Sequence, residues 1–275
     1  MEIPLYQVDA FTDRVFFGNP AAVCPLDEWL SDEVMQAIGL ENNLAETAFI
    51  IDRGDSFALR WFTPSMEVDL CGHATLAAAH VVLNHLRPEW DEVTFHSNTG
   101  PLIVSRTPEG QFMMSFPALP RERVDPPEAL LAGLSIAPTA VYGGMDYMAV
   151  YDNEEDLRAI EPDQRMLGTL DRRAVVVTAP GISSDFVARF FGPKQSIPED
   201  QFTGSAHCML VPYWAEVLGR TSLTSRQFSP RLGKTLTIHA NCELRDDRVI
   251  LGGSTRQYLA GVITLDDDEV ARLSR

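Results

Sequence analysis

The stretch Trp61–Leu86, WFTPSMEVDLCGHATLAAAHVVLNHL, decides the fold. An aromatic strand end runs into a turn at Pro64, and two acidic residues precede Cys71-Gly72-His73. The residues that follow are apolar on every side, which predicts a helix enclosed by the rest of a domain. Glycine lets another molecule approach the backbone, and the free N–H groups at a helix start attract anions. This stretch therefore predicts both the centre of a domain and a ligand site.

Composition limits the class of protein. The chain has 275 residues, 45% of them hydrophobic, which is enough for two domains of about 100–150 residues each. The net charge of −17 argues against nucleic acids and anionic membrane surfaces as partners. No apolar run approaches about 18 residues, and the first residues do not resemble a signal peptide. Four scattered cysteines without a CxxC pair are typical of free thiols, so we expect a cytoplasmic protein without a membrane span.

Local patterns place the first elements and the domain boundary. Ser31, followed by two acidic residues, is the predicted N-cap of a helix that reaches Leu40. The segment 117–127 contains four prolines and alternating charges, which is typical of a linker. We therefore expect half-domains over 1–117 and 128–275, joined by a linker over 118–127, with the chain ends free to cross between the halves.

The pattern of the opening stretch is repeated in the second half of the chain. Phe62-Thr63-Pro64, an acid and the Gly72 helix are matched by Phe191-Gly192-Pro193, Glu199-Asp200 and a helix over 204–218. Downstream, residues 99–104 resemble residues 232–237. A period of about half the chain is too long for a solenoid and predicts two similar α+β domains. Two such domains are expected to bring both helix starts toward one interdomain cleft, where small-molecule sites prefer to lie.

Glu46 is the candidate acid/base residue. It precedes a run of strand-forming residues, Thr47–Ile51, that faces a core. A carboxylate at the head of such a strand would lie in a partly dry pocket, where it could transfer protons near neutral pH. The alternative from position alone is a solvated turn residue.

The chain resembles the phenazine-biosynthesis PhzF-like family, within the diaminopimelate epimerase-like superfamily. The resemblance covers almost the whole chain, and it depends on the order and spacing of several motifs, each weak alone. These motifs are Asp9-Ala10-Phe11-Thr12 with residues 17–23, Asn43-Leu44-Ala45-Glu46-Thr47-Ala48-Phe49, residues 62–75, and Glu199-Asp200 with Thr203-Gly204-Ser205-Ala206-His207.

The resemblance implies a fold and a chemistry. The fold is α+β, with two pseudo-symmetric domains, each a β-sheet or barrel wrapped around a central buried helix and with the site between them. The chemistry is isomerisation of a small cyclic or conjugated carboxylic acid by acid/base proton transfer, without a metal or cofactor, commonly in a homodimer.

The resemblance also assigns roles to residues. Glu46 matches the glutamate that moves the proton, and His73 and Asp200 match the polar residues that assist it. Gly72, Gly204 and Ser205 match positions that bind the substrate's carboxylate and polar groups. A contact from Asn19, in the Gly18-Asn19-Pro20 turn, is a further candidate, although that turn is also explained as a purely structural feature.

Other chemistries fit the residues less well. A two-thiol racemase of this superfamily needs a thiol before each helix-start glycine, and the second position here is Thr203, whose hydroxyl cannot replace a thiolate. A metal site is not expected, because His73 and His80 are two helical turns apart and His80 and His85 should point differently. A binding or regulatory protein that keeps the fold without turnover remains the alternative from another class.

Overall fold

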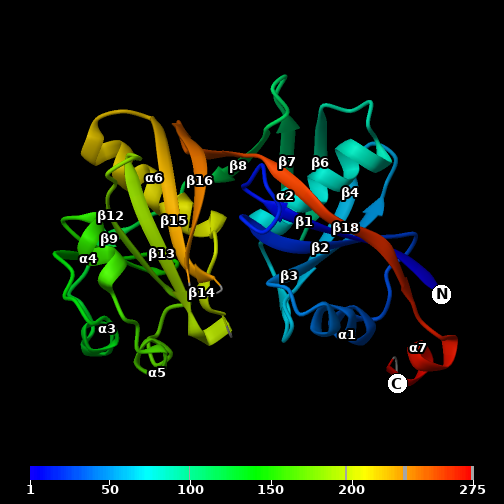
Figure 1. Cartoon of the computed structure of the whole chain (residues 1–275), viewed down its shortest axis with the longest axis horizontal. Helices are drawn as coiled ribbons and strands as arrows, with labels where there is room; N and C mark the ends of the chain where they lie inside the picture. The colour runs from blue at the N-terminus through cyan, green and yellow to red at the C-terminus, as the bar shows by residue number, and fades with distance from the viewer. Residues whose placement is uncertain (99, 196, 232–233, 274–275) are drawn as a thin grey trace. The chain divides into compact units, whose positions relative to one another are not determined.

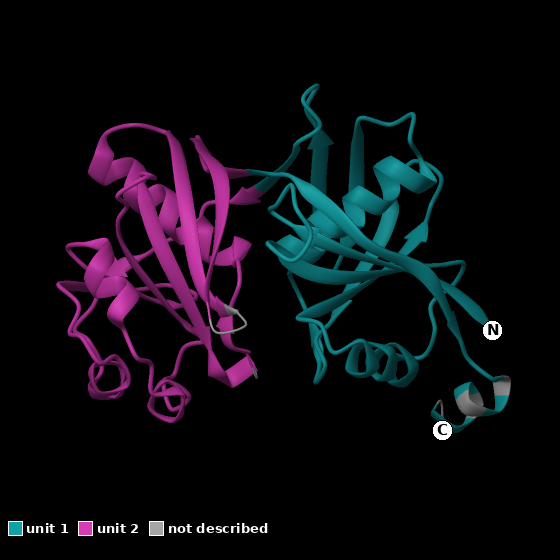
Figure 2. Ribbon diagram, in the orientation of Figure 1, with its two compact units in different colours: residues 1–115, 252–275 teal, residues 116–251 magenta. Residues whose placement is uncertain are grey.

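The computed structural model describes residues 1–98, 100–195, 197–231 and 234–273. It divides into two compact units, unit 1 with residues 1–115 and 252–275, and unit 2 with residues 116–251 (Figure 2). The C-terminal segment thus belongs with the N-terminal half. None of the described helices is long and apolar enough to cross a membrane.

Unit 1 is a sheet around one helix (Figure 1). Its strands pair in the order β18-β1-β2-β3-β4-β6-β7-β8, with β5 on β4. The elements are β1 (Glu2–Ala10), β2 (Asn19–Leu26), α1 (Asp32–Asn42), β3 (Glu46–Asp52), β4 (Phe57–Phe62), β5 (Glu67–Val68), α2 (Gly72–Val81), a π-helix (Val82–Leu86), β6 (Glu92–Ser97), β7 (Gly100–Arg106), β8 (Phe112–Pro117), β18 (Thr255–Thr264) and α7 (Asp267–Leu273).

Unit 2 repeats this order. Its strands pair as β9-β10-β11-β12-β13-β15-β16, with β14 on β13. The elements are β9 (Glu122–Arg123), α3 (Glu128–Gly133), β10 (Ala140–Gly143), β11 (Tyr147–Val150), α4 (Glu154–Ala159), α5 (Gln164–Leu167), β12 (Val175–Pro180), β13 (Phe186–Gly192), a 3₁₀ turn (Pro193–Gln195), β14 (Ile197–Asp200), α6 (Gly204–Leu218), β15 (Ser222–Arg231), β16 (Lys234–Arg245) and β17 (Arg248–Gly253).

The two units share the direction of every corresponding strand pair. In both, the first pair is antiparallel, the second parallel and the third antiparallel. The strand after the central helix then returns parallel to the strand before it, as β6 does on β4 and β15 on β13. This repeated pattern confirms the predicted α+β class, with two domains of one design. The expected match of residues 99–104 with 232–237 includes residues 99, 232 and 233, which lie outside the described residues.

Helix α2 is buried as its sequence predicts. Residues 71–79 are all buried, and the core of the unit closes around them. The predicted start of α1 is also confirmed, since the Ser31 hydroxyl accepts a hydrogen bond from the Val34 N–H at 3.4 Å. Because α2 has no solvated face, packing on every side fixes the position of its first turn.

The linker prediction was wrong in its location. Within residues 118–127, β9 pairs with β10, and the N–H groups of Ala118 and Leu119 donate to the carbonyls of Asp247 and Cys208. These backbone bonds make the proline-rich segment part of unit 2. The prolines interrupt regular structure, but they do not prevent the residues between them from joining a sheet.

The end of α2 differs from an ordinary helix. Its last turn, Val82–Leu86, is a π-helix, in which hydrogen bonds join residues five apart. The rings of His80 and His85 consequently lie close, with centroids 6.1 Å apart. The expectation that these two histidines point differently was wrong, because it assumed regular α-helical spacing.

Candidate active site

Three chain segments of unit 1 meet at the start of α2. Glu46 is the first residue of β3, and the parallel pairing of β2 and β3 sets it opposite Ala21. Cys71 is the N-cap of α2, and His73 is its second residue. The buried helix and the sheet around it therefore hold these side chains in place.

Glu46 and His73 form a buried acid–base pair. Glu46 Oε2 and His73 Nε2 are 3.0 Å apart, and the two residues are only 7% and 3% exposed. The pair lacks the alignment of a hydrogen bond, and neither atom has a hydrogen-bond partner among the described residues. A buried polar atom without a partner is costly, so such atoms cluster where a ligand completes the bonding. This is the strongest indication of a site in unit 1.

Cys71 contacts the other nitrogen of the histidine ring. Its Sγ is 3.5 Å from His73 Nδ1, and burial, reinforced by the Glu46 charge, raises the pKa of the thiol to about 11. Burial alone would lower the pKa of His73, but the adjacent Glu46 carboxylate raises it well above its ordinary value. At neutral pH the thiol is therefore neutral and the imidazole carries a positive charge.

The backbone at the start of α2 adds hydrogen-bond donors. The side chain of the N-cap residue Cys71 makes no capping bond, and the first helical bond runs from the Thr75 N–H to the Cys71 carbonyl at 3.1 Å. The N–H groups of the first turn lie before that bond, where a helix attracts negative charge. Gly72 is the first residue of this turn, next to His73, and its role in substrate binding stays a prediction.

Glu46, Cys71 and His73 also have the types of atom that bind metals. Their potential ligand atoms all lie within 4.8 Å of one another. The thiol, however, is held in its protonated form, whereas thiolate is the form that ligates. With the His73 imidazole protonated and the thiol neutral, both would have to release a proton before binding a metal, so the group fits a proton-transfer pair better than a metal site. The expectation of no metal stays a prediction.

Asn19 lies at the start of β2, next to this group in the sheet. It is 1% exposed and pairs with Ala10 of β1. The preceding residue must be glycine, because a Cβ on Gly18 would lie 2.5 Å from the Ala10 carbonyl oxygen. The turn therefore has a structural role, and a substrate contact from Asn19 stays a prediction.

In unit 2, Asp200 and Thr203 form a closed network before α6. The Thr203 hydroxyl donates to Asp200 Oδ2 at 2.5 Å, and the Thr203 N–H donates to Gln227 Oε1 at 3.0 Å. Gln227 in turn donates through Nε2 to the Asp200 carbonyl at 3.0 Å. All three residues are buried. The network holds the Asp200 carboxylate and the start of α6 in one geometry.

Ser205, one residue after the helix-start Gly204, accepts a hydrogen bond from Arg173 Nη2 at 2.9 Å. Arg173 also makes two bonds, at 2.8 and 2.6 Å, to the fully buried carboxylate of Asp146. Neither Arg173 nor Asp146 was predicted from the sequence as a site residue. A signal was available in the adjacent arginines at 172 and 173 directly before the buried strand β12, since charges beside buried strands are usually paired.

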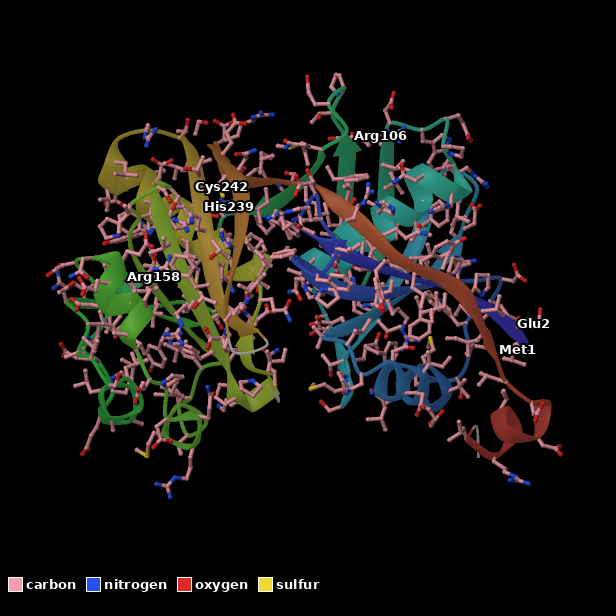
Figure 3. All side chains as sticks on the ribbon, in the orientation of Figure 1. Met1, Glu2, Arg106, Arg158, His239 and Cys242 are labelled. Atoms are coloured by element: carbon pink, nitrogen blue, oxygen red, sulfur yellow. The ribbon has the colours of Figure 1, made fainter. Side chains whose placement is uncertain are left out.

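His207 is a structural residue, bonded through both ring nitrogens. Its Nδ1 is 2.9 Å from the Thr203 carbonyl, and its Nε2 is 2.9 Å from Ser225 Oγ. Burial lowers the pKa of His207 to about 4, so it is neutral. Ser225 also accepts from Cys242, which lies on β16 (Figure 3).

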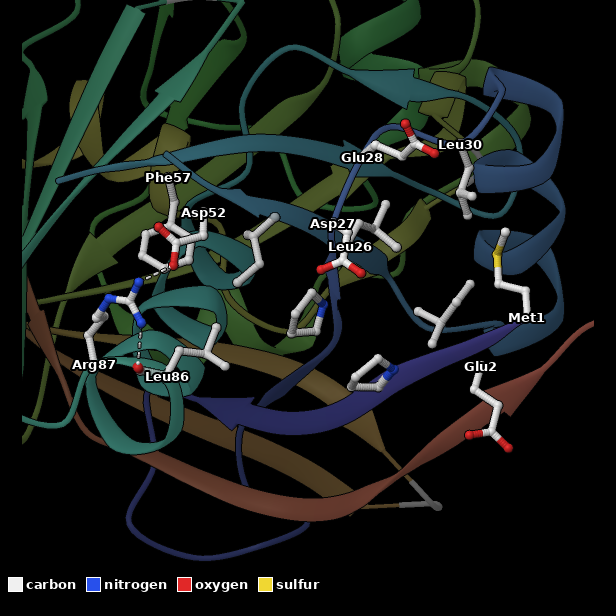
Figure 4. Close-up of a pocket in the computed structure, with 14 residues that line it drawn as sticks. Met1, Glu2, Leu26, Asp27, Glu28, Leu30, Asp52, Phe57, Leu86 and Arg87 are labelled. Carbon is white, nitrogen blue, oxygen red and sulfur yellow. Dashed lines mark hydrogen bonds and ion pairs between the residues drawn. The ribbon is translucent and has the colours of Figure 1, made fainter. Parts of the chain in front are cut away.

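A cavity of about 540 Å³ in unit 1 lies away from the acid–base pair (Figure 4). It is lined at the far ends of β2 and β3, by Leu26 and Ile50 among others, whereas Asn19 and Glu46 begin those strands. Strands of seven or eight residues put the two ends roughly 20 Å apart. None of the predicted site residues lines this cavity.

Solved structures similar to this chain show the class of fold to which it belongs. The fold matches a hydroxyproline epimerase from Agrobacterium vitis, with a TM-score of 0.58 at 11% identity over 98% of this chain and 94% of that one. At that identity the likeness concerns the fold alone. A phenazine biosynthesis protein of the PhzF family from Enterococcus faecalis is far more similar, with a TM-score of 0.90 and 44% identity over 96% of this chain and all of that one.

The sequence comparisons agree. The model of the PhzC/PhzF phenazine biosynthesis-like proteins matches residues 8–261. A Pseudomonas aeruginosa protein named "Uncharacterized isomerase PA2770" is 46% identical over 96% of this chain and its own full length. The human phenazine biosynthesis-like domain-containing protein is 33% identical with the same coverage. This chain belongs to the phenazine biosynthesis-like PhzC/PhzF family, and it is an isomerase at the level of that family.

Proposed function

We propose that this isomerase moves a proton between two carbon atoms of a small cyclic or conjugated carboxylic acid, with Glu46 as general base and then general acid. The observation that supports this most is the buried contact of Glu46 Oε2 with His73 Nε2, both without a hydrogen-bond partner among the described residues. Glu46 takes a proton from one carbon and returns it to another, so no atom is gained or lost. Such a base contributes typically 10²–10⁴-fold to the rate.

The neighbouring groups suit the charge that develops during this step. Removal of the proton spreads negative charge over the conjugated acid, and a positively charged His73 beside the site would stabilise it. The first N–H groups of α2, after Gly72, are proposed to bind the substrate's carboxylate. Asn19 is proposed to contact another polar group of the substrate.

Residues of unit 2 have proposed binding roles that derive from the family resemblance. Asp200 is proposed to assist proton transfer, and Gly204 and Ser205 to bind polar groups of the substrate. The contacts of Ser205 with Arg173 and of Asp200 with Thr203 support these roles because they fix both side chains before a ligand arrives. We further propose that the enzyme needs no cofactor, is cytoplasmic, as its four free cysteines suggest, and is a homodimer.

The test is solvent deuterium exchange into a panel of cyclic amino and hydroxy acids, followed by NMR or mass spectrometry. Wild type should introduce deuterium into at least one acid, and Glu46→Gln should do so about 10²–10⁴-fold more slowly. Glu67→Gln, a half-buried carboxylate of the same unit, is the control and should exchange like wild type. Equal exchange by Glu46→Gln would refute the assignment. Binding of the acids with no exchange in either protein would favour a non-catalytic binding protein.

A further inference from the structure

The indole of Trp61 lies on the face of the unit 1 sheet that helix α2 covers. Its neighbour Phe62 points to the other face, where its ring meets that of Phe49 in the core cluster beside α1. Successive side chains of a strand point to opposite faces, so Trp61 points toward α2. Trp61 is also directly opposite Ala48 in the antiparallel pair of β3 and β4 (Figure 1).

Glu46 and Trp61 are diagonal neighbours on this face. Glu46 precedes Ala48 by two residues, and its carboxylate contacts His73 of α2, so it points to the same side as Trp61. Diagonal neighbours on paired antiparallel strands are about 7–8 Å apart, which is within reach of an aromatic side chain. The indole of Trp61 can therefore reach the acid–base pair.

The indole N–H of Trp61 is buried without an acceptor. Its Nε1 makes no hydrogen bond to the described part of the chain, and Trp61 is 1% exposed. An indole N–H can only donate, and it usually finds an acceptor when a tryptophan is buried. Glu46 Oε2 and His73 Nε2 lack a partner in the same way. Three such atoms on one side of one sheet indicate that a bound molecule supplies their partners.

Unit 2 shows that this position does not require a donor. Phe190, a hydrocarbon ring beside Arg173, holds the place of Trp61 before the second Phe-x-Pro motif. A buried tryptophan elsewhere in unit 2 is fully bonded, since Trp214 Nε1 donates to the Thr178 hydroxyl at 2.9 Å. The indole nitrogen of Trp61 is thus not explained by the packing of the sheet.

We propose that Trp61 is a substrate-binding residue whose indole N–H donates a hydrogen bond to an oxygen of the bound acid. The inference deepens the proposed function and rests on it for the class of ligand alone. Removal of a proton by Glu46 spreads negative charge onto the oxygens of a conjugated acid, and a fixed donor in a buried site stabilises that charge. An analogue without an oxygen at this point would leave the N–H unpaired and would bind less tightly.

The first test follows the indole N–H by proton–nitrogen correlation NMR. The chain has four tryptophans, and Trp61→Phe identifies the Trp61 signal by its absence. The probes are salicylate and anthranilate, a conjugated cyclic hydroxy acid and amino acid. Each should shift the Trp61 signal, whereas the signal of Trp214, which is already bonded, should stay in place. A Trp61 signal that neither probe shifts would overturn the proposal.

The second test measures the dissociation constants of the same probes by calorimetry. Trp61→Phe keeps an aromatic ring and removes the N–H, so the dissociation constants should rise about 10–100-fold, as expected for a hydrogen bond to a charged group. Trp90→Phe, at a half-buried tryptophan between the π-helix and β6, is the matched control and should bind like wild type. Equal binding by Trp61→Phe and wild type would remove Trp61 from the site.

Stability separates a ligand contact from a structural role. Trp214→Phe removes a buried hydrogen bond as well as packing, whereas Trp61→Phe removes packing alone. The urea midpoint of the ligand-free protein should therefore fall less in Trp61→Phe than in Trp214→Phe. The opposite order would show that Trp61 is a structural residue.

The outcomes also separate this inference from the enzyme activity. If wild type exchanges deuterium, Glu46→Gln does not, and Trp61→Phe binds the probes like wild type, the proposed function stands and the role of Trp61 is refuted. If the probes shift the Trp61 signal but deuterium enters no acid, Trp61 binds acids and the proposed isomerisation is refuted.

Discussion

The two central helices of this protein begin alike, but the charged side chain that contacts the first turn is an acid in one unit and a base in the other. In unit 1, Glu46 at the start of β3 contacts His73, the residue after the helix-start glycine. In unit 2, Arg173, just before β12, contacts Ser205, which holds the same place after Gly204. One design of strand start and helix start thus presents a carboxylate in one unit and a guanidinium in the other.

The two sites also differ in how completely their polar groups are bonded. Arg173 has a buried partner in Asp146 and a second in Ser205, and His207 has partners on both ring nitrogens. Glu46 Oε2 and His73 Nε2 have no hydrogen-bond partner among the described residues. Fully bonded groups rigidify a fold, while reactive groups are kept available at a cost in stability. This difference supports the proposal that the reaction takes place in unit 1 and that unit 2 provides binding and support.

The largest expected difference is between the two carboxylates, Glu46 and Asp200. Glu46→Gln should slow turnover about 10²–10⁴-fold, because it removes the proposed base while keeping its shape. Asp200→Asn should slow it by only about 10-fold, because that carboxylate already accepts the Thr203 hydroxyl and is proposed to assist the proton transfer that Glu46 performs. The measurement is kcat for deuterium exchange. A larger loss in Asp200→Asn would reverse the assignment of the two units.

The next effect concerns stability. Arg173→Ala leaves the fully buried Asp146 carboxylate without its partner and should lower the free energy of unfolding by about 3–5 kcal/mol, measured by urea denaturation. Glu46→Gln, the matched change in unit 1, should lower it by less, because the buried His73 imidazole can release its proton once the Glu46 carboxylate is gone, whereas the buried Asp146 carboxylate loses its counter-charge outright. A strongly destabilised Glu46→Gln would show that Glu46 is structural.

The two histidines should give pH dependences of opposite sign. His207 has a folded pKa of about 4, so its neutral form stabilises the fold above about pH 6.5, and roughly 3 kcal/mol is lost as the pH falls to 4. His73 has a raised folded pKa, so its contribution is complete below pH 6.5 and is lost as the pH rises through that higher value.

Unfolding by urea between pH 4 and 9 measures both contributions. His207→Gln should flatten the acid side of the stability profile, and His73→Gln should flatten the alkaline side. If both variants flattened the same side, the charge states assigned to the two helix starts would be wrong.

The sequence predicted the centre of each unit better than its edges. Helix α2 was predictable because its apolar residues leave no polar face. That Glu46 and His73 belong to one site was predictable only from the family resemblance, which includes both of their motifs. Strands β15 and β18 were not predicted. The alternation in β15 is obscured by buried polar residues such as Ser225 and Gln227, and β18 borders little core. Pairs of residues far apart in sequence, such as Asp146 and Arg173, can be identified only once the fold brings them together.

Cys71→Ala should have the smallest effect of these changes. It tests whether the thiol at the start of α2 takes part in proton transfer. Cys71 occupies the position of a catalytic thiol in two-thiol enzymes, and Thr203 occupies the matching position in unit 2. Because the pKa of Cys71 is raised to about 11, its thiol is neutral at pH 7 and is no base.

Deuterium exchange by Cys71→Ala should therefore stay within about threefold of wild type, with stability reduced by about 1 kcal/mol for the lost packing. Cys71→Ser keeps a hydrogen-bond partner for His73 Nδ1 and should lie closer still to wild type. A loss in Cys71→Ala as large as in Glu46→Gln would make the sulfur a participant. The proton would then pass through the Cys71 thiol and the His73 imidazole at the start of α2, and the Glu46 carboxylate would stabilise the positive charge of the imidazole.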